Sequence, residues 1–312
     1  MIMQKKFPIP VCGLALGFAA LGNLFPPYYW VFRCACGIIS FAVIMGFTIR
    51  AAVDFTSVKK EMENPVAFSV LPTYTMTLML LSAYVIPFAR TAAVTVWILA
   101  LALQFVMMAF FIKAFVLKFN IKQVFPSWFI MFVGIVAASV TSPAIGMKTV
   151  GQVIFYAGFT LYLVLLPLIL YRVLKVGGIP DQARTTIAIF CAPAGLCATG
   201  YMRTFDYTGA PFATFLFALS LLSWLGVLAA MFKLLRLPFS PGYSAFTFPL
   251  VISATAFSAY GMYIGRAELY IVSLLRSSSF LIATSVTLYV LGRYCILWFS
   301  PSPAEARVSQ KS

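Results

Sequence analysis

The chain contains no histidine and only seven acidic residues among 312. Histidine is the usual proton-transfer group near neutral pH and the commonest metal ligand, so its absence removes the simplest catalytic and metal-binding sites. The six cysteines form no Cys-x-x-Cys pair and all lie in apolar stretches, where they are predicted to be small buried side chains. We therefore expect no metal, no cofactor and no enzymatic activity, because a membrane enzyme would need a nucleophile, a metal or an acid–base pair.

The few acidic residues are all predicted to lie in loops or in the C-terminal tail, and none deep in an apolar segment: Asp54, Glu61, Glu63, Asp181, Asp206, Glu268 and Glu305. Carriers driven by protons or sodium usually rely on carboxylates or histidines within the membrane. Their absence disfavours ion-coupled transport, although backbone carbonyls of broken helices can also hold sodium. Passive flow down a gradient is the simpler mechanism.

Hydrophobic residues make up 62% of the chain and charged residues 9%, and the mean hydropathy is +1.00. This composition excludes a soluble globular domain of this length and predicts an all-α integral membrane protein. Ten apolar segments are long enough to be considered as membrane spans, at about 9–24, 28–50, 66–86, 90–112, 126–143, 147–170, 186–203, 208–232, 242–264 and 267–299.

An internal repeat groups these segments in pairs. Prolines open or shortly precede an apolar stretch at Pro8, Pro65, Pro126, Pro180 and Pro241, with gaps of 57, 61, 54 and 61 residues. We therefore predict one transmembrane domain over residues 1–312, built from five helical hairpins at about 7–50, 64–112, 125–170, 180–232 and 240–299, with a short cytoplasmic tail at 300–312. The first span follows Lys5 and Lys6 as a signal peptide would, but its place in the repeat favours a retained helix.

Basic residues are distributed unequally between the two sides of the predicted bundle. Sixteen of the 22 lysines and arginines fall on the side that holds both termini, and six fall on the other. The positive-inside rule then places both termini in the cytoplasm. We expect the chain to be a multi-pass protein of the inner (plasma) membrane. Loops facing anionic lipid also explain the net charge of +15, so no nucleic-acid partner is expected.

The first span of each repeat contains the residues that break or bend helices: Gly13, Gly17, Pro72, Gly134, Pro193 and Pro249. A proline frees a carbonyl that lipid cannot satisfy, so bent helices belong inside the bundle. The same spans carry small and hydroxyl residues, including Thr73, Ser139, Thr247 and Ser253, which could line a polar path. We predict five kinked inner helices around a central pore, surrounded by five straight outer helices. In the alternative, these residues only allow the helices to pack closely.

A pore with no acids and with basic residues at both mouths has a modest positive potential. We therefore expect weak discrimination among small anions. Arg276 falls within the predicted tenth span and is a candidate anion site there, but its side chain is more simply placed at the membrane surface.

Five sequence stretches resemble the tellurite-resistance/dicarboxylate transporter family, which includes bacterial tellurite-resistance protein A and the slow-type anion channel of plant guard cells. They are FPIPVCGLALGFAAL (7–21), NPVAFSVLPTYTMTLMLL (64–81), PSWFIMFVGIVAAS (126–139), QARTTIAIFCAPAG (182–195) and YSAFTFPLVISATA (243–256). The resemblance covers nearly the whole chain. It implies a homotrimer in lipid, with a pore within each protomer.

In that family a phenylalanine of the ninth helix occludes the pore. The resemblance places this role on Phe248, just before Pro249, with Phe246 as the fallback. A phenyl ring at a constriction excludes water and raises the cost of removing an anion's hydration shell. The plant members are regulated through long cytoplasmic tails; the short ends of this chain imply that such regulation is absent.

We therefore expect an anion channel that passes chloride, nitrate and similar small anions. Two alternatives remain open. One is a secondary transporter or exporter of dicarboxylates such as malate, of sulfite or of tellurite-type oxyanions. The other is a structural or receptor-like bundle without a conduit, against which the confinement of helix breakers to alternate spans argues.

Overall fold

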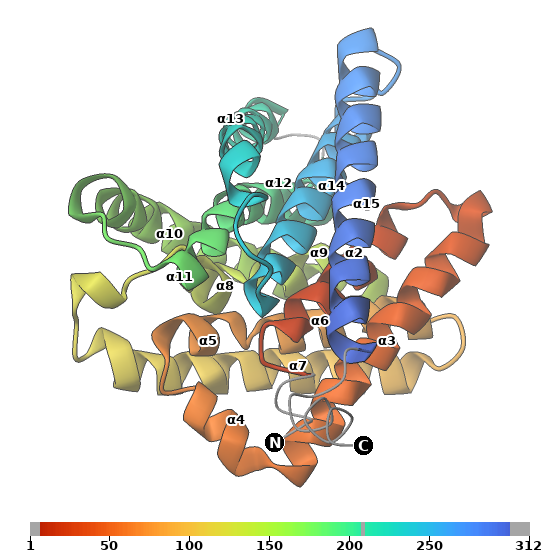
Figure 1. Ribbon diagram of the computed structural model, residues 1–312. Helices are drawn as coiled ribbons and strands as arrows, with labels where there is room; N and C mark the ends of the chain where they lie inside the picture. Colours follow the sequence, from red (N-terminus) through yellow and green to blue (C-terminus); the bar gives the residue numbers. More distant parts are fainter. Residues whose placement is uncertain (1–6, 207–209, 300–312) are drawn as a thin grey trace.

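The computed structural model describes residues 7–206 and 210–299, and these residues form helices joined by turns and loops (Figure 1). Nine helical segments of the described chain are long and apolar enough to cross a membrane. They confirm a multi-pass membrane protein. A further apolar helix, α2, has 14 residues and is shorter than a typical span, so the count of ten remains a prediction.

The helices follow the predicted segments closely. In chain order the main ones are α2 (Val11–Leu24), α3 (Trp30–Val53), α4 (Phe55–Glu61), α5 (Pro65–Val70), α6 (Thr73–Val85), α7 (Arg90–Phe111), α8 (Trp128–Val133), α9 (Val136–Ile145), α10 (Lys148–Tyr171), α11 (Asp181–Arg184), α12 (Cys191–Thr204), α13 (Ala210–Leu234), α14 (Thr247–Tyr263) and α15 (Tyr270–Phe299). Short 3₁₀ helices precede α12 at η5 (Thr185–Phe190) and α14 at η7 (Pro241–Phe246), and π-helical turns extend α7 and α10.

Burial alternates along the chain. In the spans that contain α6, α9, α12 and α14, between 67% and 89% of the residues are buried within the protein, against 22% to 33% in the other five. Helix α2 belongs with the first group, because 12 of its 14 residues are buried. The less buried helices carry large exposed apolar side chains, as expected for surfaces that face lipid: Ile38, Leu99, Val153, Leu222 and Leu281 are examples.

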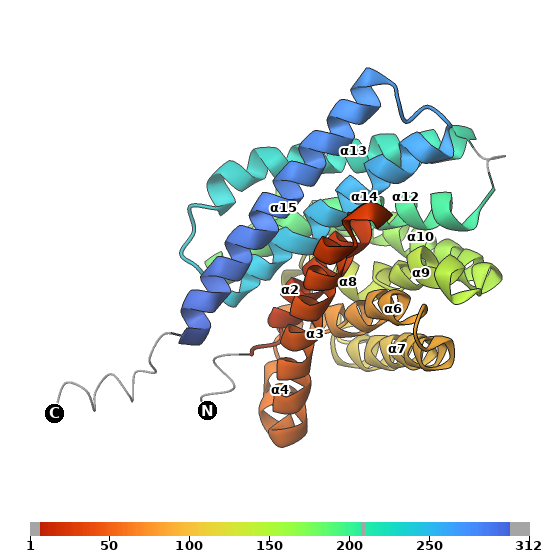
Figure 2. The same ribbon diagram turned by 90° about the vertical axis from the view of Figure 1, so that its right-hand side faces the viewer.

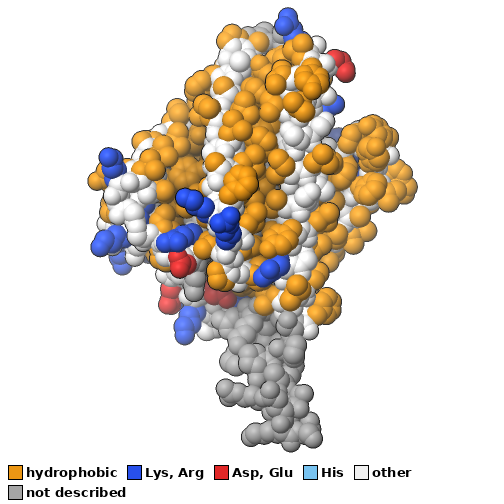
Figure 3. Space-filling view, turned by 45° about the horizontal axis from the view of Figure 1, so that its top comes forward, with side chains coloured by type: hydrophobic (Ala, Val, Ile, Leu, Met, Phe, Trp, Pro, Cys, Tyr) orange, Lys and Arg blue, Asp and Glu red, His pale blue; other side chains and the backbone are white. Residues whose placement is uncertain are grey.

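The five buried helices contact one another in a closed cycle, in the order α2, α6, α9, α12, α14 and back to α2. Each also packs against the less buried helix that follows it in the chain: α3, α7, α10, α13 and α15 respectively. Figures 1 and 2 show α15 lying along α14 and α2 at one side of this arrangement. Figure 3 shows hydrophobic side chains over most of one face, with basic side chains gathered in a few groups.

Two of the six predicted helix breaks, Pro72 and Gly134, coincide with interruptions between helices. Helices α5 and α6 are separated at Leu71 and Pro72, and α8 and α9 at Gly134 and Ile135. Pro193 and Pro249 instead lie in the first turns of α12 and α14, just after 3₁₀ segments. Backbone N–H groups of a first turn have no partner within the helix, so proline is tolerated at these positions.

The first buried helix differs from this pattern, because α2 runs without interruption through Gly13 and Gly17. A Cβ at Gly17 would lie 2.5 Å from the hydroxyl oxygen of Thr247, and one at Gly13 would lie 3.0 Å from that of Ser244. These glycines therefore allow α2 to approach the α14 segment closely, rather than breaking their own helix.

Both ends of the described chain lie on the same side of the bundle. The rings of Phe7 and Trp298 stack with their centroids 5.6 Å apart, just before α2 and near the end of α15. This is the side of α4, a short amphipathic helix that the sequence did not predict. Asp54 begins it by accepting a hydrogen bond from the Ser57 amide at 3.0 Å.

Candidate functional site

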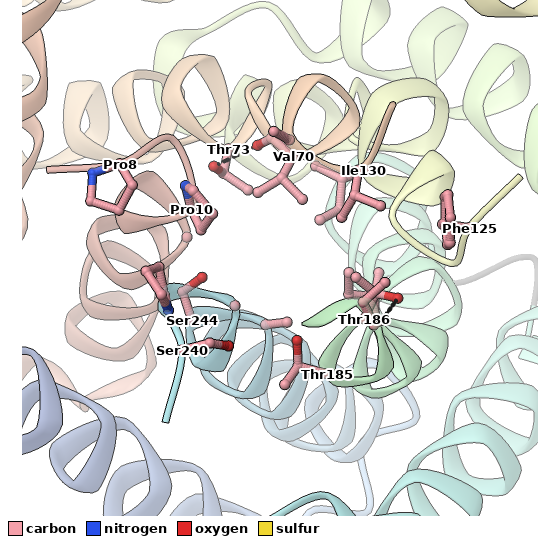
Figure 4. A pocket seen from close by; sticks show the side chains of 18 of the residues that line it. Pro8, Pro10, Val70, Thr73, Phe125, Ile130, Thr185, Thr186, Ser240 and Ser244 are labelled. Carbon is pink, nitrogen blue, oxygen red and sulfur yellow. Dashed lines mark hydrogen bonds between the residues drawn. The ribbon is translucent and has the colours of Figure 1, made fainter. Parts of the chain in front are cut away.

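Residues of the five buried spans line a cavity of about 550 Å³ at the end nearest Phe7 and Trp298, here called the terminal-side cavity. Its wall includes one residue from the beginning of each buried span: Gly13, Thr73, Ile130, Ala192 and Phe248. The third of these spans reaches the cavity through α8 and not through α9. Figure 4 looks into this cavity, with Thr73, Ile130 and Ser244 placed around its opening. The lining is mainly apolar, so little in it would hold an ion tightly.

A second cavity, of about 430 Å³, lies at the opposite end of the same helices and is here called the far-side cavity. It too has a lining residue from each of the five buried helices: Ala20, Ala83, Thr141, Arg203 and Thr255. Phe25 and Arg33 complete its rim. The two cavities thus share their five walls and open toward opposite ends of the bundle.

The two cavities come closest along α14. Phe248 and Pro249 line the terminal-side cavity, and Ile252 lines the far-side cavity. Phe248 and Ile252 are four residues apart, which is about 6 Å along a helix axis. On α14, residues that line the two cavities are therefore about one helical turn apart or less.

The two phenylalanines considered from the sequence lie in different surroundings. Phe248 is 4% exposed and lines the cavity, and none of the ring pairs between described aromatic residues includes it. Phe246 is fully buried, packs edge-on against Tyr243 with the ring centroids 5.0 Å apart, and lines neither cavity. The gating role of Phe248 remains a prediction, and its position is compatible with it.

The four hydroxyl residues predicted to line a pore are all buried, but only Thr73 lines a cavity. Thr247 donates to the carbonyl oxygen of Gly13 at 3.0 Å, and Ser253 donates to those of Cys191 at 3.4 Å and Pro249 at 2.9 Å. Ser139 packs beside Gly200 of α12. Thr247 and Ser253 therefore join neighbouring helices, in agreement with the alternative in which such residues serve packing.

Helices α12 and α14 approach each other closely at Gly195. A Cβ at this position would lie 3.2 Å from the backbone of both Ile252 and Ser253. Any larger side chain would push α14 outward at the level where the two cavities are nearest. Gly195, two residues after Pro193, thus sets the spacing of α12 and α14 at this level.

A buried ion pair lies at the wall of the terminal-side cavity. The Arg50 side chain, at the end of α3, is 1% exposed; it pairs with Glu61 of α4 and donates to the Phe7 carbonyl oxygen at 2.7 Å. Glu61 also accepts a hydrogen bond from the Ile9 amide at 3.1 Å and lines the cavity. From the sequence, Glu61 was predicted to lie in a loop and Arg50 to end the second span, and their 11-residue separation gave no sign of a contact.

The sequence also gave no sign that Arg33 and Arg203 share a cavity. They lie 170 positions apart, in different repeats, and were counted only among the basic residues of the side opposite the termini. The internal repeat is the signal that could have predicted their proximity, because it places corresponding ends of the buried helices on the same side of the bundle. Arg276 is exposed in the second turn of α15 and lines neither cavity.

Comparison with known proteins identifies the family. The profile of the SLAC1 family, described as voltage-dependent anion channel, matches residues 6–295. A tellurite resistance protein TehA homolog of Haemophilus influenzae is 28% identical over 219 residues, which span 65% of this chain and 66% of that protein, just under two thirds of its length. The chain belongs to the SLAC1 family, which confirms the family predicted from the five sequence stretches.

Proposed function

We propose that this member of the SLAC1 family is an anion channel that passes chloride, nitrate and similar small anions passively. The proposed route runs inside one protomer, between the terminal-side and far-side cavities. The observation that carries the proposal is that residues of the same five buried spans line both cavities, and that Phe248 and Ile252, about one helical turn apart on α14, line opposite ones.

The closed cycle of contacts among α2, α6, α9, α12 and α14 supports a five-helix inner ring around this route. The five less buried helices would form the outer ring. The lining chemistry favours anions over cations, because two arginines face the far-side cavity, and the one carboxylate of the terminal-side lining, Glu61, is paired with Arg50.

Phe248 would occlude the route. Phe248 lines the terminal-side cavity one helical turn from the far-side lining on α14, and an apolar side chain there cannot replace the water that an anion must lose, which raises the barrier to passage. The assembly we propose is a homotrimer in the plasma membrane, with the Phe7 and Trp298 side in the cytoplasm. That orientation agrees with the 16 basic residues on this side against six on the other.

An anion-flux assay in proteoliposomes tests the gate. Phe248→Ala is expected to release chloride and nitrate faster than the parent protein, because the substitution removes the ring from the proposed route. Phe246→Ala is the matched control, since it removes a phenyl ring two residues away that packs on Tyr243 and lines neither cavity. Equal fluxes through the parent and both variants would refute Phe248 as the gate.

A second candidate is a secondary transporter or exporter of dicarboxylates, sulfite or tellurite-type oxyanions. The name of the Haemophilus influenzae relative, a tellurite resistance protein homolog, favours it. Two cavities that open toward opposite ends of the bundle also suit a carrier that opens to one side at a time. Flux that saturates with malate or sulfite concentration, and that accelerates when the same anion is present on the opposite side, would support this candidate over a channel.

A further inference from the structure

Two guanidinium groups line the far-side cavity, and no acidic residue of the described chain lines it. Arg33 lies near the start of α3 and Arg203 in the last turn of α12, so the two reach the cavity from different repeats. Neither forms an ion pair within residues 7–206 and 210–299. The nearest acid in sequence to Arg203, Asp206, is paired with Lys148 at 2.8 Å.

Arg33 is held in place by neutral groups. Its Nη2 donates to the Ala83 carbonyl oxygen at 3.4 Å, and its guanidinium lies over the Tyr84 ring, 5.0 Å from the centroid. Tyr84 is itself fixed, because its hydroxyl donates to the Ala19 carbonyl oxygen at 2.7 Å. These contacts orient the guanidinium while leaving its charge unneutralised and most of its five donors available.

Arg203 makes a single long contact, from Nη1 to the Val140 carbonyl oxygen at 3.5 Å. That bond is at the limit of hydrogen-bonding distance, so it satisfies little of this group. The cavity therefore contains two positive charges with unused N–H donors, that of Arg33 held in place, in a volume of about 430 Å³ that accommodates a small solute. The terminal-side cavity is different, since Glu61 is the only charged residue among the described residues that line it.

We infer that the far-side cavity is a binding site for small oxyanions, with Arg33 and Arg203 as its ligands. A guanidinium presents parallel N–H donors that match two oxygens of a carboxylate, nitrate or sulfite, whereas a halide offers a single atom to both donors and fits them less well. The site would raise the concentration of oxyanions at this mouth relative to chloride. The inference rests on the proposed function for its role in transport, but binding itself does not require conduction.

Binding to the purified full-length protein in detergent tests the site without measuring transport. Sulfite, nitrate and chloride are titrated at constant ionic strength, and thermal stability is recorded, because a ligand that binds only the folded state raises the melting temperature. The parent protein is expected to be stabilised by sulfite and nitrate at lower concentrations than by chloride. Arg33→Gln and Arg203→Gln are each expected to weaken oxyanion binding at least tenfold.

Two further variants make the result specific. Arg266→Gln removes an exposed arginine from the loop between α14 and α15, away from the cavity lining, and should bind oxyanions as the parent does. Arg203→Lys keeps the charge but loses the fork, so it should lose the preference for oxyanions over chloride while remaining folded. This second variant decides the matter if a glutamine variant fails to fold.

Three outcomes would overturn the inference: equal stabilisation by sulfite and chloride, unchanged binding in both arginine variants, or stabilisation by anionic phospholipid with none by free oxyanions. The last would mean that the arginines contact lipid phosphate. If the protein binds oxyanions but Phe248→Ala passes no anions, the binding site is supported and the channel is refuted. If Phe248→Ala passes anions but the protein binds no oxyanion, the channel is supported and the binding site is refuted.

Discussion

Replacing Glu61 by glutamine should destabilise the protein strongly, because it leaves the Arg50 charge buried without a counter-charge. The Arg50 side chain is 1% exposed and the Glu61 side chain 20%. Glutamine retains an oxygen that can accept from the Ile9 amide, so the substitution tests the charge more than the hydrogen bonds. Removing one partner of a buried ion pair typically costs about 3–5 kcal/mol, and we expect about 3 because Glu61 is partly exposed.

The chain provides its own control in the ion pair between Lys148 and Asp206, whose side chains are 46% and 84% exposed. Asp206→Asn should cost about 0–1 kcal/mol, as is usual for exposed pairs. The free energy of unfolding is measured for both variants by denaturant titration in mixed micelles. Arg50→Met combined with Glu61→Gln should be more stable than the sum of the single changes predicts, because it removes the unpaired charge.

The reasoning would be refuted if Glu61→Gln lowered stability no more than Asp206→Asn does. It would also fail if the effects of Arg50→Met and Glu61→Gln simply added, since groups coupled through a buried charge should not be additive. Either result would mean that water reaches Arg50 freely despite its 1% exposure.

Two other substitutions test how the walls pack. Gly195→Ala should lower the free energy of unfolding by about 1–3 kcal/mol through overpacking, since its Cβ would lie 3.2 Å from the α14 backbone. The control is Gly226→Ala on α13, whose Cβ would meet nothing within 4 Å and which should be neutral or slightly stabilising. Denaturant titration compares the two variants. Thr247→Val should lose about 1 kcal/mol with its bonds to the Gly13 and Ser244 carbonyl oxygens, yet leave anion flux through the Phe248→Ala background unchanged. A change in flux would instead assign Thr247 to the pore.

The membrane-spanning helices could be predicted from the sequence because each is a long apolar run between polar loops. The predicted segment at 90–112 corresponds to α7 at Arg90–Phe111, and that at 147–170 to α10 at Lys148–Tyr171. The alternation of buried and lipid-facing helices also followed from the sequence, because prolines and glycines concentrate where lipid does not need to satisfy the backbone.

The contacts within the site could not be predicted, because they depend on tertiary geometry. Nothing local to Thr247 tells whether its hydroxyl faces a pore or the Gly13 carbonyl oxygen, 234 residues away. The burial of Arg50 was missed for the same reason: a basic residue at a helix end usually remains in solvent, and here α4 folds back to cover it. The sharing of one cavity by Arg33 and Arg203 could not be predicted either, because it depends on how the helices of different repeats pack together.

The current through a planar lipid bilayer that contains purified Phe248→Ala, in a gradient of chloride, tests the channel most directly. The account predicts a current far larger than that of the parent, by about 100-fold for a barrier lowered by about 3 kcal/mol, reversing at the chloride equilibrium potential. Phe246→Ala should conduct like the parent. A Phe248→Ala current equal to that of the parent, or one reversing at the cation potential, would contradict the account.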